Sequence, residues 1–440
     1  MSFRITVVLI FGFLFVLDTF PSLYCNEYFK DDEEKRNSTF RQEWGHANIR
    51  EGAHMFWWLY YTNADVDNYT DRPLIIWLQG GPGMPGSGYG NFVEIGPLDS
   101  NFKEKDYTPA EDFNILFIDN PVGVGYSYVE DNSTSLPQNN KDVADDLMRF
   151  FEIFIKEKPE FLKTSIYIFG ESYGGKMVVE FAYQIMKEQK QKKKNRWNLK
   201  GIGLGNSFIS PINYIRSYAP FALHLGLVDK NGFTRIDEWA AHIEHLVTTK
   251  KFEEAWIAEN TMVNILIGEM PGIDIYNFNA RLNISLKPGY LSYIPRFSEI
   301  MNGEVKDNLS ITQNIEWQFF SNEVYEKLAA DVIKPVTKKI EVLLNNTDIK
   351  IIVYNGVLDF LVNTAGTRLW MNNLKWKHKD EWRELRQTPF EVEQDVAEGY
   401  YKKYGNLILY VIFRAGHSVP VDNMPAFRQI LKQELLCGEL

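Results

Sequence analysis

A serine enclosed by glycines, in the segment Gly170–Gly174 (Gly-Glu-Ser-Tyr-Gly), constrains this chain more than any other feature. It follows the apolar run Ile166–Phe169 and precedes a helix-like segment that begins near Lys176. Glycines permit a sharp, strained turn between a strand and a helix, and such a turn exposes the serine hydroxyl as a nucleophile. A chance match to this short pattern is the alternative, but few chance matches lie between a strand and a helix. The pattern therefore predicts a nucleophile elbow with Ser172 at its tip.

A nucleophile of this kind needs a base, and the base comes last in the chain order serine, acid, histidine. Two histidines are placed late enough to serve. His378 lies in the charged run Lys375–Glu381, which is typical of a solvated surface. His417 instead follows the strand-like run Leu407–Phe413, and a loop at the end of a strand is where such a base belongs. We therefore expect His417 to be the base.

The acid is expected between the serine and the histidine. Asp359 fits, because it follows a strand-like run that ends near Gly356. Asp119 also ends a strand, but it precedes Ser172 and so breaks the order. Considered alone, Asp359 has a turn cap as its alternative role; the presence of the other two groups favours a catalytic role.

A second group of glycines, Gly80–Gly83 (Gly-Gly-Pro-Gly), follows the strand-like run Leu74–Leu78. Glycines leave the backbone N–H groups accessible to a neighbouring segment. One N–H of this loop, together with the N–H of Tyr173, would form an oxyanion hole. A tight turn alone is the alternative, and it explains one glycine better than three.

The N-terminal residues 1–25 have the pattern of a signal peptide. Arg4 precedes the apolar run Ile5–Leu17, which Asp18 ends and which is too short to span a bilayer. A buried core strand is the alternative. No later run reaches transmembrane length, so we expect no membrane anchor and a secreted or lysosomal protein. Sequons for N-glycosylation agree with this route, and they occur at Asn37, Asn68, Asn132, Asn283, Asn308 and Asn345.

Composition excludes other classes of protein. The chain has 440 residues, 45% of them apolar, and a net charge of -11, which argues against a nucleic-acid partner. Its two cysteines, Cys25 and Cys437, allow one disulfide at most, and Cys25 leaves with the signal peptide if cleavage follows it. His242 and His245 have no third ligand at useful spacing, so we expect no metal. The lysine-rich run 187–200 is typical of a solvated helix end.

Short apolar strands alternate with amphipathic helices, which predicts an α/β fold with a mostly parallel sheet covered by helices on both faces. The aromatic run Met55–Tyr61 is expected as an antiparallel edge strand. Residues 211–344 have helical periodicity and few strand runs. We expect them to form a helical cap inserted between two parts of the core, residues 26–210 and 345–440. The other expected elements are strands Leu74–Leu78, Ile115–Ile118, Ser165–Phe169, Gly201–Leu204, Ile349–Tyr354 and Leu407–Phe413, and helices Val143–Glu157 and Met177–Glu188.

Four blocks of the sequence resemble the serine carboxypeptidase family over nearly the whole mature chain. They are Trp77–Gly83 with Glu94–Pro97, Asn114–Pro121 with Gly123–Tyr128, Gly170–Gly175, and Gly416-His417 with Val419-Pro420. Within the family, Met55–Tyr61, Gln79 and Gly90–Asp99 look most like the retinoid-inducible branch, with vitellogenic carboxypeptidase as a relative. The resemblance implies the α/β-hydrolase fold.

The resemblance also implies an activity, the release of C-terminal amino acids from peptides with a free C-terminus, often at acidic pH and without a cofactor. The site residues that it implies are Ser172, Asp359 and His417 as the catalytic triad, Gly81 and Tyr173 as oxyanion-hole donors, and Gln79, Gly80, Glu94 and Glu171 as the group that binds the substrate carboxylate. An acyltransferase with the same triad, and a binding or stabilising partner with weak hydrolase activity, are the alternatives.

Two acids beside a carboxylate substrate need an explanation. Carboxyl groups in a shielded site cannot all ionise without strong repulsion, so they share protons and their apparent pKa rises. A protonated Glu171 can then donate a hydrogen bond to the substrate carboxylate, with the Gln79 amide and the Gly80 N–H as further donors. Alternatively, Glu171 points away and pairs with a surface lysine.

The sequence departs from the family pattern at four places. Gln79 stands where many members have asparagine, and its amide reaches one methylene further. Met84-Pro85 replaces a usual cysteine, so family disulfides cannot form here. Ser418 stands where a methionine usually follows the histidine, and Val357 where an aspartate often precedes the acid. None of these changes touches the predicted triad.

Overall fold

The computed structural model describes residues 40–130, 135–192, 197–281, 294–311 and 314–436. These residues contain an eleven-stranded sheet. Its strands are β1 (Gln42–Arg50), β2 (Ala53–Tyr60), β3 (Leu74–Leu78), β4 (Asn114–Ile118), β5 (Tyr128–Val129), β6 (Ile166–Glu171), β7 (Leu199–Gly205), β10 (Lys350–Gly356), β11 (Thr388–Glu393), β12 (Val396–Tyr404) and β13 (Leu407–Ile412).

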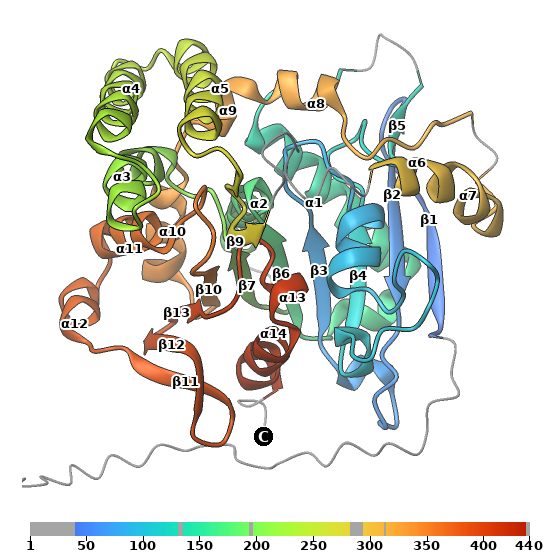
Figure 1. Ribbon diagram of the computed structural model, residues 1–440. Helices are drawn as coiled ribbons and strands as arrows, with labels where there is room; N and C mark the ends of the chain where they lie inside the picture. Colours follow the sequence, from blue (N-terminus) through green and yellow to red (C-terminus); the bar gives the residue numbers. More distant parts are fainter. Residues whose placement is uncertain (1–39, 131–134, 193–196, 282–293, 312–313, 437–440) are drawn as a thin grey trace, which may run out of the picture.

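The strand order is β1-β2-β4-β3-β6-β7-β10-β13-β12-β11, with β5 paired to β2 (Figure 1). Neighbours from β4 to β13 pair in parallel, and the outer strands add antiparallel pairs at both edges. Every strand predicted for the centre of the sheet is present, because each is a short apolar run buried on both sides. The predicted α/β architecture with a mostly parallel sheet is confirmed.

The prediction of an edge strand at Met55–Tyr61 is wrong. This run forms β2, and β1 pairs along its outer side. Alternate side chains of β2 enter the hydrophobic cores on opposite faces of the sheet. A strand buried on both faces has no polar face, so the unbroken aromatic run was the sign of an interior position. β1 mixes polar and apolar residues and therefore gives no comparable signal in the sequence.

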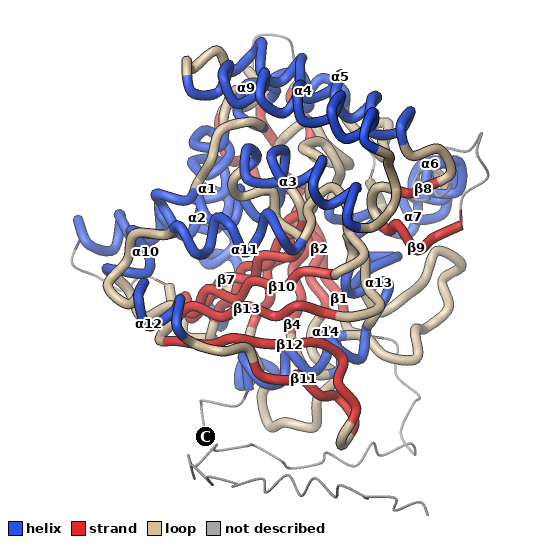
Figure 2. The backbone as a smooth tube through the Cα atoms, turned by 60° about the vertical axis from the view of Figure 1, so that its left-hand side comes forward, coloured by secondary structure: helices blue, strands red, loops and turns tan. Residues whose placement is uncertain are grey.

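Helices cover both faces of the sheet (Figures 1 and 2). One core packs beneath α1 (Asn140–Glu157), α2 (Tyr173–Lys192), α10 (Thr337–Asn346), α11 (Thr364–Asn373) and α12 (Lys379–Glu384). The opposite core packs beneath the π-helix η2 (Gly86–Ile95), α13 (Val419–Asp422), α14 (Met424–Leu431) and η6 (Lys432–Leu436). The remaining short turns are η1 (Tyr69–Asp71), η3 (Pro109–Glu111) and η4 (Pro159–Leu162).

The segment predicted as a cap contributes no strand to the large sheet within its described residues, since β8 (Ile273–Asp274) and β9 (Asn277–Arg281) pair only with each other. Its helices are α3 (Pro211–His224), α4 (Lys230–Thr248), α5 (Phe252–Glu269), α6 (Ile294–Asn302), α7 (Glu304–Asn308), α8 (Asn322–Lys327) and α9 (Ala329–Val332). In Figures 1 and 2, α4, α5 and α9 lie together at the top of the molecule. The boundaries of the cap at residues 211 and 344 stay a prediction, and α10, near the second boundary, packs against α2.

In the described part of the chain, no helix is both long enough and apolar enough to cross a membrane. The predicted signal peptide, Cys25 and Cys437 lie outside the described residues.

Candidate active site

Ser172 is the single residue between β6 and α2. Its φ of 58° lies in the left-handed region, which a non-glycine residue seldom adopts. The turn is tight enough that a Cβ on Gly174 would lie 2.2 Å from the carbonyl oxygen of Leu78 in the neighbouring strand. The Ser172 N–H donates to the Gly205 carbonyl at 3.0 Å, which fixes the turn to the end of β7. This is the geometry that the glycine-serine-glycine pattern predicts.

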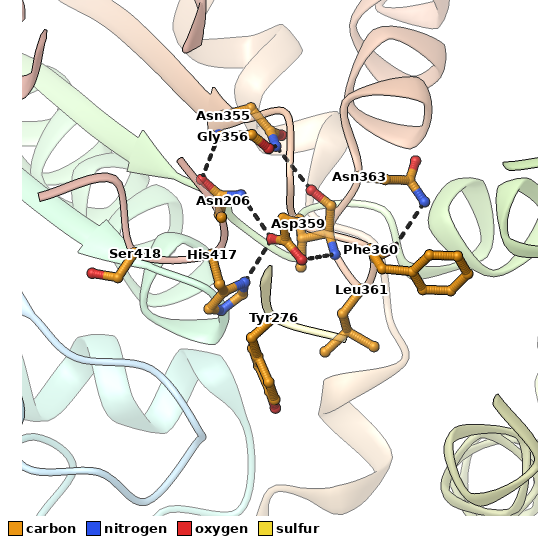
Figure 3. Close-up of polar contacts among 12 residues, drawn as sticks. Asn206, Tyr276, Asn355, Gly356, Asp359, Phe360, Leu361, Asn363, His417 and Ser418 are labelled. Atoms are coloured by element: carbon orange, nitrogen blue, oxygen red, sulfur yellow. Dashed lines mark hydrogen bonds and ion pairs between the residues drawn. The ribbon is translucent and has the colours of Figure 1, made fainter. Parts of the chain in front are cut away.

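His417 and Asp359 lie side by side (Figure 3). His417 Nδ1 is 2.7 Å from Asp359 Oδ2, although the two residues are 58 positions apart. Asp359 follows β10 and His417 follows β13, and these strands are parallel neighbours whose carboxyl ends meet at one edge of the sheet. The side chain of Asp359 is fully buried. The hydrogen bond on Nδ1 leaves Nε2 as the ring atom available to a substrate or a nucleophile.

Asn206 is a partner of Asp359 that the sequence analysis missed. It lies just beyond β7, and its Nδ2 donates to Asp359 Oδ2 at 2.7 Å while its Oδ1 accepts from the Gly356 N–H at 3.1 Å. Asp359 Oδ1 also accepts from the Val362 N–H at 2.9 Å. Donors on both oxygens fix the plane of the carboxyl group. The signal available in the sequence was a polar residue just beyond a predicted parallel strand.

We expect Asn206→Ala to lower kcat roughly tenfold with little change in KM, because Asp359 loses a donor that fixes its orientation. It should also destabilise the protein by about 1–3 kcal/mol, since buried groups lose a partner. Steady-state kinetics and thermal unfolding measure the two effects. A lower melting temperature with unchanged kcat would mean that Asn206 serves the fold alone.

The histidine loop is held by two further contacts. The His417 N–H donates to the Tyr276 carbonyl at 2.7 Å, and the two rings meet edge to face with centroids 4.9 Å apart. The Gly416 N–H donates to Asp422 Oδ2 at 2.7 Å. Tyr276 lies between β8 and β9, so the segment predicted as a cap touches His417 (Figure 3). Nothing in the sequence pairs Tyr276 with His417, because the contact depends on how the segment predicted as a cap folds.

The two rejected candidates have other partners. His378 precedes α12, where its ring lies near Trp376 and Tyr404 and its Nδ1 is 3.7 Å from Glu381 Oε1. Asp119 accepts from the N–H and hydroxyl of Ser87 and from the N–H of Tyr126. Burial raises the pKa of Asp119 to about 6, although these donors oppose the rise. Asp119 thus holds the loop around η2.

The glycine loop after β3 lies directly on the elbow. A Cβ on Gly80 would be 2.8 Å from Ser172 Cβ and 3.3 Å from the Tyr173 nitrogen, so only glycine fits there without a shift. Gly81 has a φ of 112°. The structure therefore brings the two predicted oxyanion donors, Gly81 and Tyr173, onto segments that touch beside Ser172.

A cluster of buried polar side chains lies next to the elbow: Gln79, Glu94, Glu171 and Ser418. Ser418 Oγ donates to Glu94 Oε1 at 2.6 Å. The Glu171 carboxyl and the Gln79 amide lie close enough to Glu94 to affect its pKa. Trp77 Nε1 donates to Gln79 Oε1 at 2.7 Å, which leaves the Gln79 NH2 group as a donor for other partners. Glu171 is thus buried, and the alternative that it pairs with a surface lysine does not apply.

A hydrogen bond between the Glu94 and Glu171 carboxyl groups would require a proton on one of them. Burial raises the pKa of both carboxyl groups. For Glu171 the negative charge of Glu94 is the next cause, and the pKa of Glu171 is raised well above its usual value. For Glu94 the hydrogen bonds oppose the rise, with that from Ser418 the strongest. The pair therefore holds one proton between two carboxyl groups, with Glu171 favoured to carry it.

Two members of this neighbourhood were not expected from the sequence. Ser418 was noted only as a departure from the family pattern, and here its hydroxyl joins the carboxyl pair. Lys105 Nζ lies 3.3 Å from the Glu94 carbonyl and 3.4 Å from that of Asn91. Burial lowers the pKa of Lys105 to about 7, against the charges of Glu94 and Asp99. These contacts join segments far apart in sequence, so no local pattern announces them.

Across the ranges that the structure covers, no group of three His, Cys, Asp or Glu side chains is arranged to hold a metal ion. His242 and His245 lie one turn apart on α4.

Comparison with known proteins places the chain. The family model described as "Serine carboxypeptidase" matches residues 33–436. Retinoid-inducible serine carboxypeptidase of Mus musculus is 32% identical over 420 residues, which are 90% of this chain and 92% of that protein. Serine carboxypeptidase-like 51 of Arabidopsis thaliana is 33% identical over 419 residues, 88% of this chain and 90% of that protein.

Among solved structures, a prohormone-processing carboxypeptidase from Saccharomyces cerevisiae, Kex1(delta)p, superposes with a TM-score of 0.77 at 27% identity. The match covers 90% of this chain and 91% of that one. It confirms the predicted α/β-hydrolase fold. Together with the family model over nearly the whole chain, these likenesses leave one assignment: the chain belongs to the serine carboxypeptidase family.

Proposed function

We propose that this serine-type carboxypeptidase removes C-terminal amino acids from peptides through an acyl-enzyme formed on Ser172. Ser172 Oγ attacks the carbonyl carbon before the last residue, while His417 Nε2 accepts the serine proton. Asp359 orients the imidazole and stabilises its cationic form. The tetrahedral oxyanion accepts hydrogen bonds from the N–H groups of Gly81 and Tyr173. His417 then protonates the leaving amine, and water hydrolyses the ester by the same steps in reverse.

The observation that carries this proposal is the meeting of strand ends at one edge of the sheet. The elbow follows β6, Asn206 follows β7, Asp359 follows β10 and His417 follows β13, and these strands are consecutive parallel neighbours. Ligands of open α/β sheets bind at this carboxyl edge. The hydrogen bond between His417 Nδ1 and Asp359 selects the tautomer in which Nε2 can take a proton.

The carboxyl pair supports an exopeptidase rather than an endopeptidase. Glu171 immediately precedes Ser172, so a group that binds the chain end lies one residue from the nucleophile. A substrate held there presents its terminal carboxylate to Glu171 and its last peptide carbonyl to Ser172. Recognition needs the protonated carboxyl as a donor, so we propose that peptide binding is strongest at acidic pH.

A fluorophosphonate probe tests the nucleophile directly. The proposal expects a covalent adduct on the tryptic peptide that contains Ser172, formed at a rate that depends on His417. It expects no adduct in Ser172→Ala, and an unchanged rate in His378→Ala. Labelling of a different serine, or equal labelling of Ser172→Ala, would reject the assignment.

We also propose that the protein enters the secretory pathway and is secreted or lysosomal. The signal-like N-terminus and the sequons support this location. Of the sequons, Asn37, Asn132 and Asn283 lie outside the described residues, and Asn68, Asn308 and Asn345 are exposed. The Asn345 amide already donates to the carbonyls of Glu341 and Lys375.

After expression in eukaryotic cells, we expect glycans at Asn68 and Asn308, because both side chains face solvent and can carry a large sugar. We expect lower occupancy or a small loss of stability at Asn345, whose hydrogen bonds a glycan would disturb. Mass spectrometry before and after enzymatic removal of glycans measures each site. Secretion of a chain without a glycan at any sequon would contradict this part of the proposal.

A further inference from the structure

Lys176 is a fully buried lysine that the triad does not use. It lies in the first turn of α2, directly after the elbow. Its Nζ donates to the Asp331 carbonyl at 2.6 Å and to the Val332 carbonyl at 2.8 Å, which are the last carbonyls of α9. A cation at a helix C-terminus satisfies carbonyls that have no partner within the helix. The contact therefore joins the helix behind the nucleophile to the inserted segment across 155 positions.

Tyr173 makes a second connection to the same place. Its hydroxyl donates to Asp331 Oδ2 at 3.2 Å, and Lys176 Nζ lies 5.1 Å from the centre of its ring. Both Tyr173 and Asp331 are buried. The backbone N–H of Tyr173 is one proposed oxyanion donor. The contact between the Tyr173 side chain and Asp331 therefore helps to fix the position of this donor.

The other oxyanion donor is held by the same stretch of chain. Eleven positions before Val332, the Ser321 N–H donates to the Gly83 carbonyl at 2.9 Å. The ring of Phe320 packs on the glycine loop, where a Cβ on Gly81 or on Gly83 would be 3.4 Å from Phe320 Cε2. Residues 320–332, which include α8 and α9, therefore contact both loops that supply the oxyanion hole. We name this stretch the clamp segment.

We propose that Lys176 is a positioning residue, which anchors the clamp segment to the elbow and so fixes the two oxyanion donors relative to each other. This inference rests on the proposed function of Ser172, Gly81 and Tyr173. The clamp segment is short and has contacts at both ends, so a shift at Asp331 is passed to the glycine loop at Gly83. Oxyanion stabilisation depends steeply on donor position, because the donors must meet the tetrahedral oxygen rather than the ground-state carbonyl.

The charges around Lys176 come from α9 and the residues that follow it. Burial lowers the pKa of Lys176 to about 7, the charge of Asp331 opposes this, and Lys334 and Lys339 add to it. At pH 5 Lys176 is therefore the ammonium ion, which carries enough protons for both carbonyls of α9. A buried charge is retained only where such partners are present, so the site is built for a lysine and not for an apolar side chain.

The test compares Lys176→Met, which keeps a long side chain but removes the charge and its donors, with Lys190→Met in the exposed part of the same helix. For Lys176→Met we expect kcat at pH 5 to fall roughly 10- to 100-fold, less than the 10²–10³-fold loss of deleting a donor outright. KM and the inhibition constant of a product amino acid should change less than threefold, because the ground-state site is intact. The rate of reaction with a fluorophosphonate, which also places a negative oxygen in the hole, should fall in parallel with kcat. Lys190→Met should leave all of these values unchanged.

Tyr173→Phe serves as a second variant that removes only the hydroxyl contact to Asp331 and keeps the backbone N–H. We expect a fall in kcat of about threefold, and a smaller effect of Tyr173→Phe in the Lys176→Met background, because both act through Asp331.

If Lys176→Met does not fold, Tyr173→Phe and the mild substitution Asp331→Asn carry the test by the same readouts. Unchanged kcat and fluorophosphonate rate in the folded variants, or a change confined to KM, would overturn the inference. Full activity of Ser172→Ala would instead overturn the proposed function itself.

Discussion

Ser172→Ala and His417→Ala are each expected to lower kcat for peptide hydrolysis about 10⁶-fold, and Asp359→Asn about 10⁴-fold. The serine supplies the covalent bond, and the histidine supplies both proton transfers. Asp359→Asn keeps the shape of the side chain, but an amide that donates toward His417 Nδ1 would select the wrong tautomer. The losses should not add in double variants, because the three residues act as one unit. Steady-state and single-turnover kinetics on one peptide measure the effects.

His378→Ala is the matched control for the base. Its ring packs near Trp376 and Tyr404, away from the contacts of Asp359. The variant should keep full activity while the His417 variant is inactive, and circular dichroism should show that both proteins are folded. The reverse result would show that the base is misassigned.

Glu171→Gln is expected to flatten the dependence of peptide KM on pH. In the native site, burial and the charge of Glu94 raise the pKa of Glu171 well above its usual value. The proton is therefore present at acidic pH, and the carboxyl donates to the substrate carboxylate. As the pH rises through this raised pKa the proton leaves, and two carboxylates then repel a third. Native KM should thus rise with pH, by about tenfold in total for each unit by which bound substrate raises the pKa of the pair.

The glutamine variant keeps an N–H donor that does not titrate. Its KM at acidic pH should lie within about tenfold of the native value, and it should change little as the pH rises. Exposed Glu157 on α1 provides the control Glu157→Gln, which should reproduce the native pH profile. A variant with the native rise of KM would show that another group titrates, and the protonated pair would not be the recognition element.

Much of the architecture could be predicted because its signals are local. The central strands are short apolar runs, and β3 has the bounds that the sequence indicates. The outer strands are different. β11 and β12 carry many exposed residues and are fixed by pairing with β13, so their sequences alone give weak signals. The position of β2 was missed because it depends on β1, whose mixed composition hides a strand.

The residues of the candidate site also divide into those with a local signal in the sequence and those without one. Ser172, Asp359 and His417 could be found because each follows a recognisable strand and their order is fixed by the fold. Asn206, Tyr276 and Ser418 could not, because their roles come from contacts that span long stretches of chain. Ser418 to Glu94, for example, joins residues 324 positions apart. Such partners become apparent only when the strand ends and the segment predicted as a cap are brought together.

We propose that the carboxyl pair beside Ser172 selects peptides with a free C-terminus. It is tested most directly by mass spectrometry of the products from one peptide supplied either with a free C-terminus or as its C-terminal amide, at pH 5. We expect stepwise loss of single residues from the end of the free acid, at a kcat/KM at least about 100-fold above that of the amide. The amide lacks the negative oxygens that accept a charge-assisted hydrogen bond. Equal rates on the two forms, or cleavage within the peptide, would contradict it.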